Sequence, residues 1–143
     1  MSCALITGAA GFVGSHLIEL LEREPDTMPD GSPRQIVGWL RPNTEPLVAG
    51  TRIIWHGVEL HDRRAVADAI AAFKPSQIYH LAGVPHIGES WGHVHETFAG
   101  NVLGTHHLFA ALRQHGLKPR VLITLKPKLA AVMSTPFNVP RLS

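Results

Sequence analysis

Apolar residues recur along this chain with two alternating spacings, which predict strands and helices in turn. Short apolar runs rich in branched residues predict strands over residues 3–7, 35–40, 52–57, 77–83 and 120–124. Apolar positions three or four residues apart predict helices over residues 12–24, 62–74 and 94–115. Pro25, Pro75 and Gly116 end these helices. The alternation is typical of an α/β fold, a parallel sheet of about five strands with helices on both faces.

The alternating pattern stops after Thr124. Residues 125–143 contain Pro127, Pro136 and Pro140, which break every periodic pattern, and they contain no acidic residue. We therefore divide the chain into a domain of residues 1–124 and a divergent tail of residues 125–143. Our hypothesis for the tail is a reading-frame accident or a deletion scar.

Composition bounds the class of protein without identifying a partner. The chain has 143 residues, of which 45% are hydrophobic, enough for one ordinary domain. Its net charge of +2 comes without a basic stripe, which argues against nucleic acid and anionic membranes as partners. A single cysteine excludes an internal disulfide framework, and neither a spanning apolar run nor a signal peptide is seen. These features predict a cytoplasmic protein.

Three glycines separate the first predicted strand from the first predicted helix. Gly8, Gly11 and Gly14 follow the spacing GxxGxxG. Glycine permits a tight turn, close approach of backbone N–H groups to a pyrophosphate, and close packing of the helix on the strand. The helix N-terminus adds a partial positive charge and unpaired N–H donors. The pattern predicts dinucleotide binding, and a purely structural turn is the alternative.

The residue that follows the second predicted strand bears on the type of dinucleotide. An acidic residue at this place accepts hydrogen bonds from a ribose 2′-hydroxyl, whereas an arginine pairs with a 2′-phosphate. This strand ends at Leu40 and is followed by Arg41, with no acidic residue before Glu45. Arg41 therefore favours NADP over NAD, although a solvated surface charge explains an arginine in a loop equally well.

Four segments, in order, resemble a known family. They are TGAAGFVGSHL at residues 7–17, IYHLAG at 78–83, IGESW at 87–91 and NVLGTHHL at 101–108. Over residues 3–124 the chain resembles the extended short-chain dehydrogenase/reductase family of NAD-dependent epimerases and dehydratases, most closely the GDP-mannose 4,6-dehydratases and 4-keto-sugar reductases. The resemblance implies an incomplete Rossmann-type sheet, an NAD(P)-binding half-domain and a nucleotide-sugar substrate. Gly83, Val84 and Pro85 depart from the family's usual residues on the substrate side.

The resemblance also implies which residues contact the cofactor. Besides Gly14 of the glycine turn, the positions that match the family are Gly8, Gly11, Phe12, Val13, Arg41, Glu59, Leu60, Leu81, Ala82 and Gly83. Glu59 and Leu60 would lie beside the adenine. For Leu60, Leu81 and Ala82, ordinary packing against the sheet is the alternative explanation.

No catalytic residue is assigned. The resembled family uses a Tyr-x-x-x-Lys pair, in which the tyrosine moves a proton and the lysine lowers its pKa. The single tyrosine, Tyr79, has Gly83 four residues later, and Lys126 and Lys128 have no tyrosine four residues earlier. We therefore expect an amino-terminal half that binds NAD(P) without catalysis. A module that senses NADP or pairs with an intact homologue, and a remnant without function, are the alternatives.

The last predicted strand has an expected structural cost. Without a further strand beside it, residues 121–124 form an exposed apolar edge, which favours association into a homo-oligomer or with a homologue.

Ten histidines is a high count for this length, and five of them, together with the single cysteine, are weighed as candidate site residues. His86, His93 and His95 are near one another in sequence, but their spacing does not place them on one helix face and no carboxylate or thiol completes a site, so no metal is expected. His106 and His107 are expected on a polar helix surface. Cys3 is expected to be a small core residue.

Overall fold

The computed structural model of the chain describes residues 2–46, 52–82 and 94–123, and for residues 94–100 the backbone alone. Its elements are, in order, β1 (Ser2–Thr7), α1 (Phe12–Arg23), β2 (Arg34–Leu40), β3 (Ile53–Gly57), α2 (Arg63–Phe73), β4 (Gln77–His80), α3 (Val94–Gln114) and β5 (Arg120–Ile123). Each lies where the apolar spacing predicts it. Strand β4 is shorter than expected, because Leu81 and Ala82 leave the sheet to approach the glycine turn.

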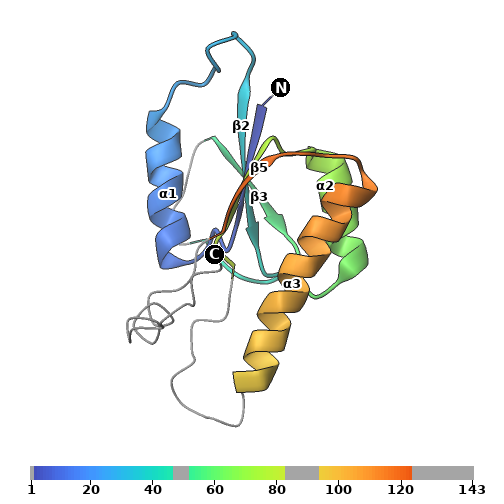
Figure 1. Cartoon of the computed structure of the whole chain (residues 1–143). Helices are drawn as coiled ribbons and strands as arrows, with labels where there is room; N and C mark the ends of the chain where they lie inside the picture. Colours follow the sequence, from blue (N-terminus) through green and yellow to red (C-terminus); the bar gives the residue numbers. More distant parts are fainter. Residues whose placement is uncertain (1, 47–51, 83–93, 124–143) are drawn as a thin grey trace, which may run out of the picture.

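All five strands are parallel and form one sheet in the order β3-β2-β1-β4-β5 (Figure 1). The strand order reverses direction at β1, which has β2 on one side and β4 on the other. In open α/β sheets, ligands bind outside the carboxyl ends of the strands at such a reversal. The α/β fold with a Rossmann-type parallel sheet is confirmed.

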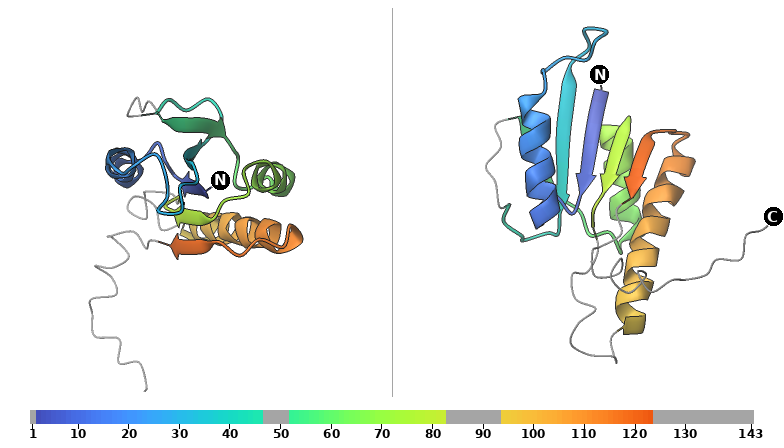
Figure 2. Two further views of the ribbon diagram at one scale, coloured as in Figure 1. Left: turned by 90° about the horizontal axis from the view of Figure 1, so that it is seen from above. Right: turned by 60° about the vertical axis from the view of Figure 1, so that its left-hand side comes forward.

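The helices cover both faces of the sheet, with α1 on one face and α2 and α3 on the other (Figure 2). Alternate residues of β1 enter two separate cores. Cys3 and Leu5 pack in the core beneath α2 and α3, and Ile6 packs in the core beneath α1. Because successive side chains of a strand point to opposite faces, a strand buried on both faces reads as a continuous apolar run.

Strand β5 forms an edge of the sheet and is poorly covered within the described residues. It pairs only with β4 there, and Leu122 and Ile123 are 55% and 46% exposed. The expected exposed apolar edge is thus confirmed for Leu122 and Ile123, whereas Val121 packs partly against the core beneath α2 and α3. The expected domain boundary at residue 124 and the tail of residues 125–143 lie outside the described residues, so the division of the chain stays a prediction. In the described part of the chain, no helix has the length and apolar character needed to cross a membrane.

Candidate functional site

The carboxyl ends of the strands gather the predicted cofactor residues at one edge of the sheet. Because all five strands run parallel, the residues that follow them emerge at the same edge. Gly8 follows β1, Arg41 follows β2, and Leu81 follows β4. Glu59 and Leu60 lie in the connection between β3 and α2. The fold therefore brings together, on one edge, segments that are far apart in sequence.

The glycine turn is packed so closely that side chains are excluded. Gly8 has a φ of +67°, and a Cβ added there would lie 2.7 Å from the backbone N of Ala82 and 2.8 Å from the carbonyl carbon of Leu81. A Cβ on Gly14 would lie 2.6 Å from the carbonyl oxygen of Gly8. These distances are shorter than any tolerable carbon contact, so both positions require glycine. Gly8 and Ala82, predicted separately, are direct neighbours.

The N-terminus of α1 has no side-chain cap within the described residues. Gly11 is its N-cap residue and has no side chain to accept the first N–H groups, and the first turn contains no acidic residue. Phe12 and Val13 in that turn are 75% and 54% exposed. A helix leaves its first four N–H groups without partners inside the helix, and its dipole favours negative charge there. By contrast, Asp62 caps α2 by accepting hydrogen bonds from Arg64 and Ala65.

Three hydrogen-bonded polar side chains, two of them buried and the third partly buried, lie beneath the glycine turn. The hydroxyl of Thr7 lies 2.7 Å from Nδ1 of His80 and accepts a hydrogen bond from the backbone N–H of Ala82 at 3.2 Å. On the other side of the imidazole, Nε2 lies 2.9 Å from Oγ1 of Thr105 on α3. Burial lowers the pKa of His80, because the charged form would lose its hydration.

Sequence reasoning did not assign a role to Thr7, His80 or Thr105. A signal was present, since Thr7 and His80 are polar residues within predicted strands that also contain buried apolar residues, but their partnership depends on strand register. Thr7 pairs with His80 across β1 and β4, and α3 brings Thr105 to the same face.

The segment expected beside the adenine is partly fixed by α3. The carbonyl oxygen of Leu60 lies 2.8 Å from Nδ1 of His107, and a Cβ on Gly104 would lie 3.3 Å from that of Leu60. The expectation of a polar surface position for His107 is therefore wrong, since its side chain is buried against Leu60. His106, the adjacent residue, is exposed as expected.

The two charged candidates are at the surface. Arg41 is exposed, and within the described residues its guanidinium makes no salt bridge. Glu59 is exposed, accepts a hydrogen bond from the backbone N–H of His61 at 3.2 Å, and lies 3.8 Å from the ring of the same histidine. Among the described residues, the Arg41 guanidinium has no ion-pair partner, whereas the Glu59 carboxylate has a local one in His61.

Some expectations fall outside the described residues. Gly83, His86 and His93 lie there, as does the side chain of His95. In the rest of the chain, no three His, Cys, Asp or Glu side chains are placed to hold a metal ion. Cys3 is confirmed as a core residue, since it is buried and burial raises its pKa to about 11.

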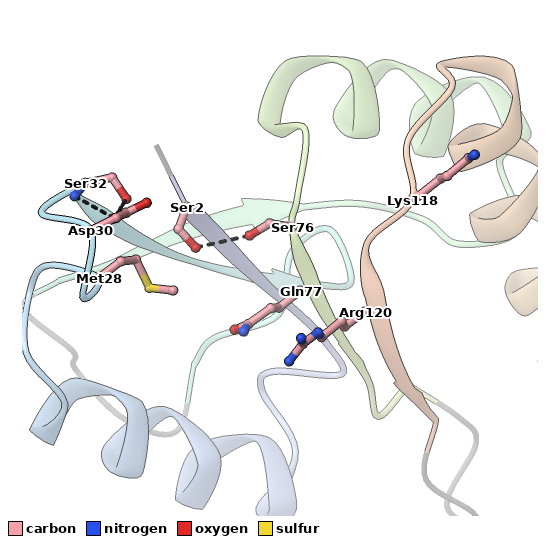
Figure 3. A pocket seen from close by; sticks show the side chains of 8 residues that line it. All are labelled: Ser2, Met28, Asp30, Ser32, Ser76, Gln77, Lys118 and Arg120. Carbon is pink, nitrogen blue, oxygen red and sulfur yellow. Dashed lines mark hydrogen bonds between the residues drawn. The ribbon is translucent and has the colours of Figure 1, made fainter.

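A hollow on the surface lies at the opposite edge of the sheet. It opens among the amino ends of β1, β4 and β5 (Figure 3). The residues that line it are Ser2, Met28, Asp30, Ser32, Ser76, Gln77, Lys118 and Arg120. None of them is among the predicted cofactor residues, so this hollow and the glycine turn are separate features.

Comparison with known proteins identifies the family. The family model described as GDP-mannose 4,6 dehydratase matches residues 5–125. The chain belongs to the GDP-mannose 4,6 dehydratase family. This confirms the resemblance to NAD-dependent epimerases and dehydratases that the four sequence segments carried.

Relatives of this GDP-mannose 4,6 dehydratase family member include both dehydratases and epimerases. The chain is 29% identical over 112 residues to the dTDP-glucose 4,6-dehydratase of Neisseria meningitidis, covering 78% of this chain and 31% of the relative. It is 30% identical over 145 residues to UDP-glucose 4-epimerase 2 of Oryza sativa, covering 95% of this chain and 33% of the relative. The chain thus spans about a third of the length of these relatives.

Solved structures agree with the family assignment. The Thermus thermophilus UDP-glucose 4-epimerase in complex with NAD has a TM-score of 0.63 and 28% identity, covering 81% of this chain and 35% of that one. The Bifidobacterium longum UDP-glucose 4-epimerase in complex with NAD+ and UDP has a TM-score of 0.70, with 88% and 37% covered, and its 21% identity shows likeness of fold alone.

Proposed function

We propose that this domain binds a nicotinamide dinucleotide as the cofactor-binding part of a nucleotide-sugar epimerase or dehydratase, with NADP preferred over NAD. The observation that carries the proposal is the Gly8 turn, which lies at the carboxyl end of the central strand and leads into an α1 N-terminus without a side-chain cap. This combination suits a pyrophosphate.

The residues present fit the dinucleotide in three places. Gly8, Gly11 and Gly14 keep side chains out of the turn, so the backbone N–H groups at the start of α1 are open to the pyrophosphate. Leu60 and Glu59 would line the adenine side. Leu81 and Ala82 would line the side toward the nicotinamide.

Arg41 supports the preference for NADP. It follows β2, where a dinucleotide fold reads the adenine ribose, and its exposed guanidinium suits a 2′-phosphate. NAD is the alternative, favoured by the NAD complex of the Thermus thermophilus relative. The two cofactors differ by one phosphate group, so a substitution at Arg41 separates them.

When bound, the nicotinamide supplies hydride transfer to or from a nucleotide sugar. The chain's own residues would bind and orient the dinucleotide, whereas the proton transfer of the resembled family needs a tyrosine and a lysine. The single tyrosine, Tyr79, is half-buried against the core beneath α1, and the residue four positions later is Gly83. We therefore propose binding without turnover for residues 1–143 alone.

Titration of the purified chain with NADPH and NADH tests the proposal. Binding is followed by fluorescence of the reduced nicotinamide and by thermal shift. We expect saturable binding, tighter for NADPH. Arg41→Ala should weaken NADPH about tenfold and NADH little, because a charge-assisted hydrogen bond contributes roughly 1.5–3 kcal/mol.

Arg113→Ala is the matched control, since Arg113 is also exposed but lies in the last turn of α3. It should change neither affinity. Equal losses of NADPH affinity from the two substitutions would mean that Arg41 acts only through the overall charge of the protein. Absence of binding by a folded sample would overturn the cofactor proposal. Turnover of any nucleotide sugar by this chain alone would contradict binding without catalysis.

A further inference from the structure

The hydrogen bonds that join Thr7, His80 and Thr105 beneath the glycine turn can be assigned a direction of donation. Oγ1 of Thr105 donates its single proton to the backbone carbonyl of Asn101, 2.9 Å away. The hydroxyl has no second proton to offer, so toward His80 it acts only as an acceptor. His80 must therefore carry a proton on Nε2, which donates to Thr105 over 2.9 Å.

The direction of the hydrogen bonds on the Nδ1 side of His80 follows from this. A neutral imidazole with its proton on Nε2 has an unprotonated Nδ1, which accepts a hydrogen bond. Thr7 then donates its hydroxyl proton to Nδ1 over 2.7 Å and accepts the N–H of Ala82 at 3.2 Å. Each group in the series from Ala82 to Asn101 donates one proton to the next.

The reverse arrangement leaves a buried proton without a partner. If Nδ1 carried the proton, the Thr7 hydroxyl would accept from both His80 and Ala82, and its own proton would have no acceptor among the described residues. Thr7 is fully buried, so an unmade hydrogen bond there is costly. A doubly protonated His80 would also donate from Nδ1, so the Thr7 proton would again have no acceptor among the described residues.

We propose that His80 is a positioning residue that, as the neutral tautomer protonated on Nε2, holds Ala82 against Gly8 by orienting the hydroxyl of Thr7. It links α3 to the glycine turn without touching the dinucleotide. Ala82 N lies nearest, at 2.7 Å, to the place that a Cβ on Gly8 would occupy, so its position limits the space at the turn. The consequence for dinucleotide affinity rests on the proposed function, whereas the tautomer and the hold on Ala82 do not.

The first test is the protonation state of His80. Nitrogen-15 NMR of the imidazole ring at pH 7, assigned by loss of its signals in His80→Asn, should show Nε2 protonated and Nδ1 unprotonated. In Thr105→Val, which removes the acceptor, the form protonated on Nδ1 should become populated. Thr105→Ser, which keeps the hydroxyl, should retain the wild-type tautomer. A proton on Nδ1 in the wild-type protein would overturn the proposal.

The second test follows the effect to Ala82 and the dinucleotide. Hydrogen exchange at the Ala82 amide should be about threefold or more faster in Thr105→Val than in wild type, and NADPH should bind about three- to tenfold more weakly, as for loss of one hydrogen bond. Thr105→Ser should restore both values. A loss of thermal stability equal in Val and Ser variants would indicate general packing instead.

The two proposals fail in different ways. If the folded wild-type chain binds no dinucleotide, the proposed function fails, while the tautomer and the Ala82 exchange rate still decide the role of His80 in the turn. If NADPH binds and Thr105→Val changes neither Ala82 exchange nor affinity, the role of His80 fails and the proposed function stands.

Discussion

Strand β1 lies between β2 and β4, whereas β5 pairs with β4 alone within the described residues. Both are short, apolar and parallel to their neighbours. Residues 3–7 of β1 are buried, but three of the four residues of β5 are exposed. Position in the sheet, not composition, makes β1 a rigid support for a site and β5 an open edge.

The glycine turns next to β1 and β5 also differ in how closely other parts of the molecule pack against them. Gly8 follows β1 with a φ of +67°, and Gly116, between α3 and β5, has a φ of +65°. An added Cβ would strike the backbone of Leu81 and Ala82 at Gly8, but would meet nothing within 4 Å at Gly116. The same backbone conformation thus serves close packing in one place and only helix termination in the other.

The largest expected effect comes from shortening one leucine in each strand. Leu5 is fully buried in the core beneath α2 and α3, and Leu122 is largely exposed. Leu5→Ala should lower the free energy of unfolding by about 2–5 kcal/mol through lost burial and a cavity. Leu122→Ala should change it by less than about 0.5 kcal/mol. Urea denaturation measures both, and a similar loss from the two would mean that β5 is covered in solution.

A pair of glycine substitutions sharpens the comparison of the turns. Gly116→Ala should cost about 1–2 kcal/mol, the penalty of a left-handed conformation for an L-residue. Gly8→Ala carries that penalty and a clash with the Ala82 backbone, so it should be the more destabilising and should also reduce NADPH binding at least tenfold, by displacing the turn. Thermal unfolding and NADPH titration separate the two contributions. Equal stability in both variants would show that the turn adapts.

A smaller effect should appear in the pH dependence of stability. His80 attaches β4 to β1 and is more acidic in the folded state than its ordinary pKa of 6.5. As the pH falls, the unfolded chain takes up the proton first, so this contribution is complete above about 6.5 and is lost through the lower, folded-state pKa. The groups bonded to its ring, Thr7 and Thr105, carry no charge.

Urea unfolding between pH 7 and pH 5 measures this dependence. Wild type should lose more stability on acidification than His80→Asn, which cannot take up the proton. Equal slopes would mean that the folded protein does not hold His80 neutral.

The smallest perturbation is chemical labelling of a thiol in each strand. Cys3 is buried in β1 and its pKa is raised to about 11, so in the folded protein it should not react with a thiol reagent at pH 8. A cysteine introduced by Leu122→Cys in a Cys3→Ala background should react at the rate of an exposed thiol. Slow reaction at position 122 would indicate that another surface covers β5.

Much of the fold was predictable because the apolar spacing and the turn residues favour the same helices and strands that the tertiary packing buries. The helix bounds of α1 follow from apolar spacing and Pro25, and the glycine turn follows from its spacing. The polar support of the turn was not predictable, since Thr7, His80 and Thr105 meet only through strand register and the packing of α3. His107 was misassigned for the same reason, because its partner is a backbone carbonyl 47 residues away.

The sequence by itself determined the order of strands and helices, the glycine turn, and the absence of a Tyr-x-x-x-Lys pair, because each depends on residues close together along the chain. Only the tertiary structure decided that the Ala82 backbone lies against Gly8, that Thr7, His80 and Thr105 meet beneath the glycine turn, and that His107 is buried against Leu60. These depend on atoms within a few ångströms that come from distant segments, and a one-dimensional pattern of polarity does not record which segments become neighbours.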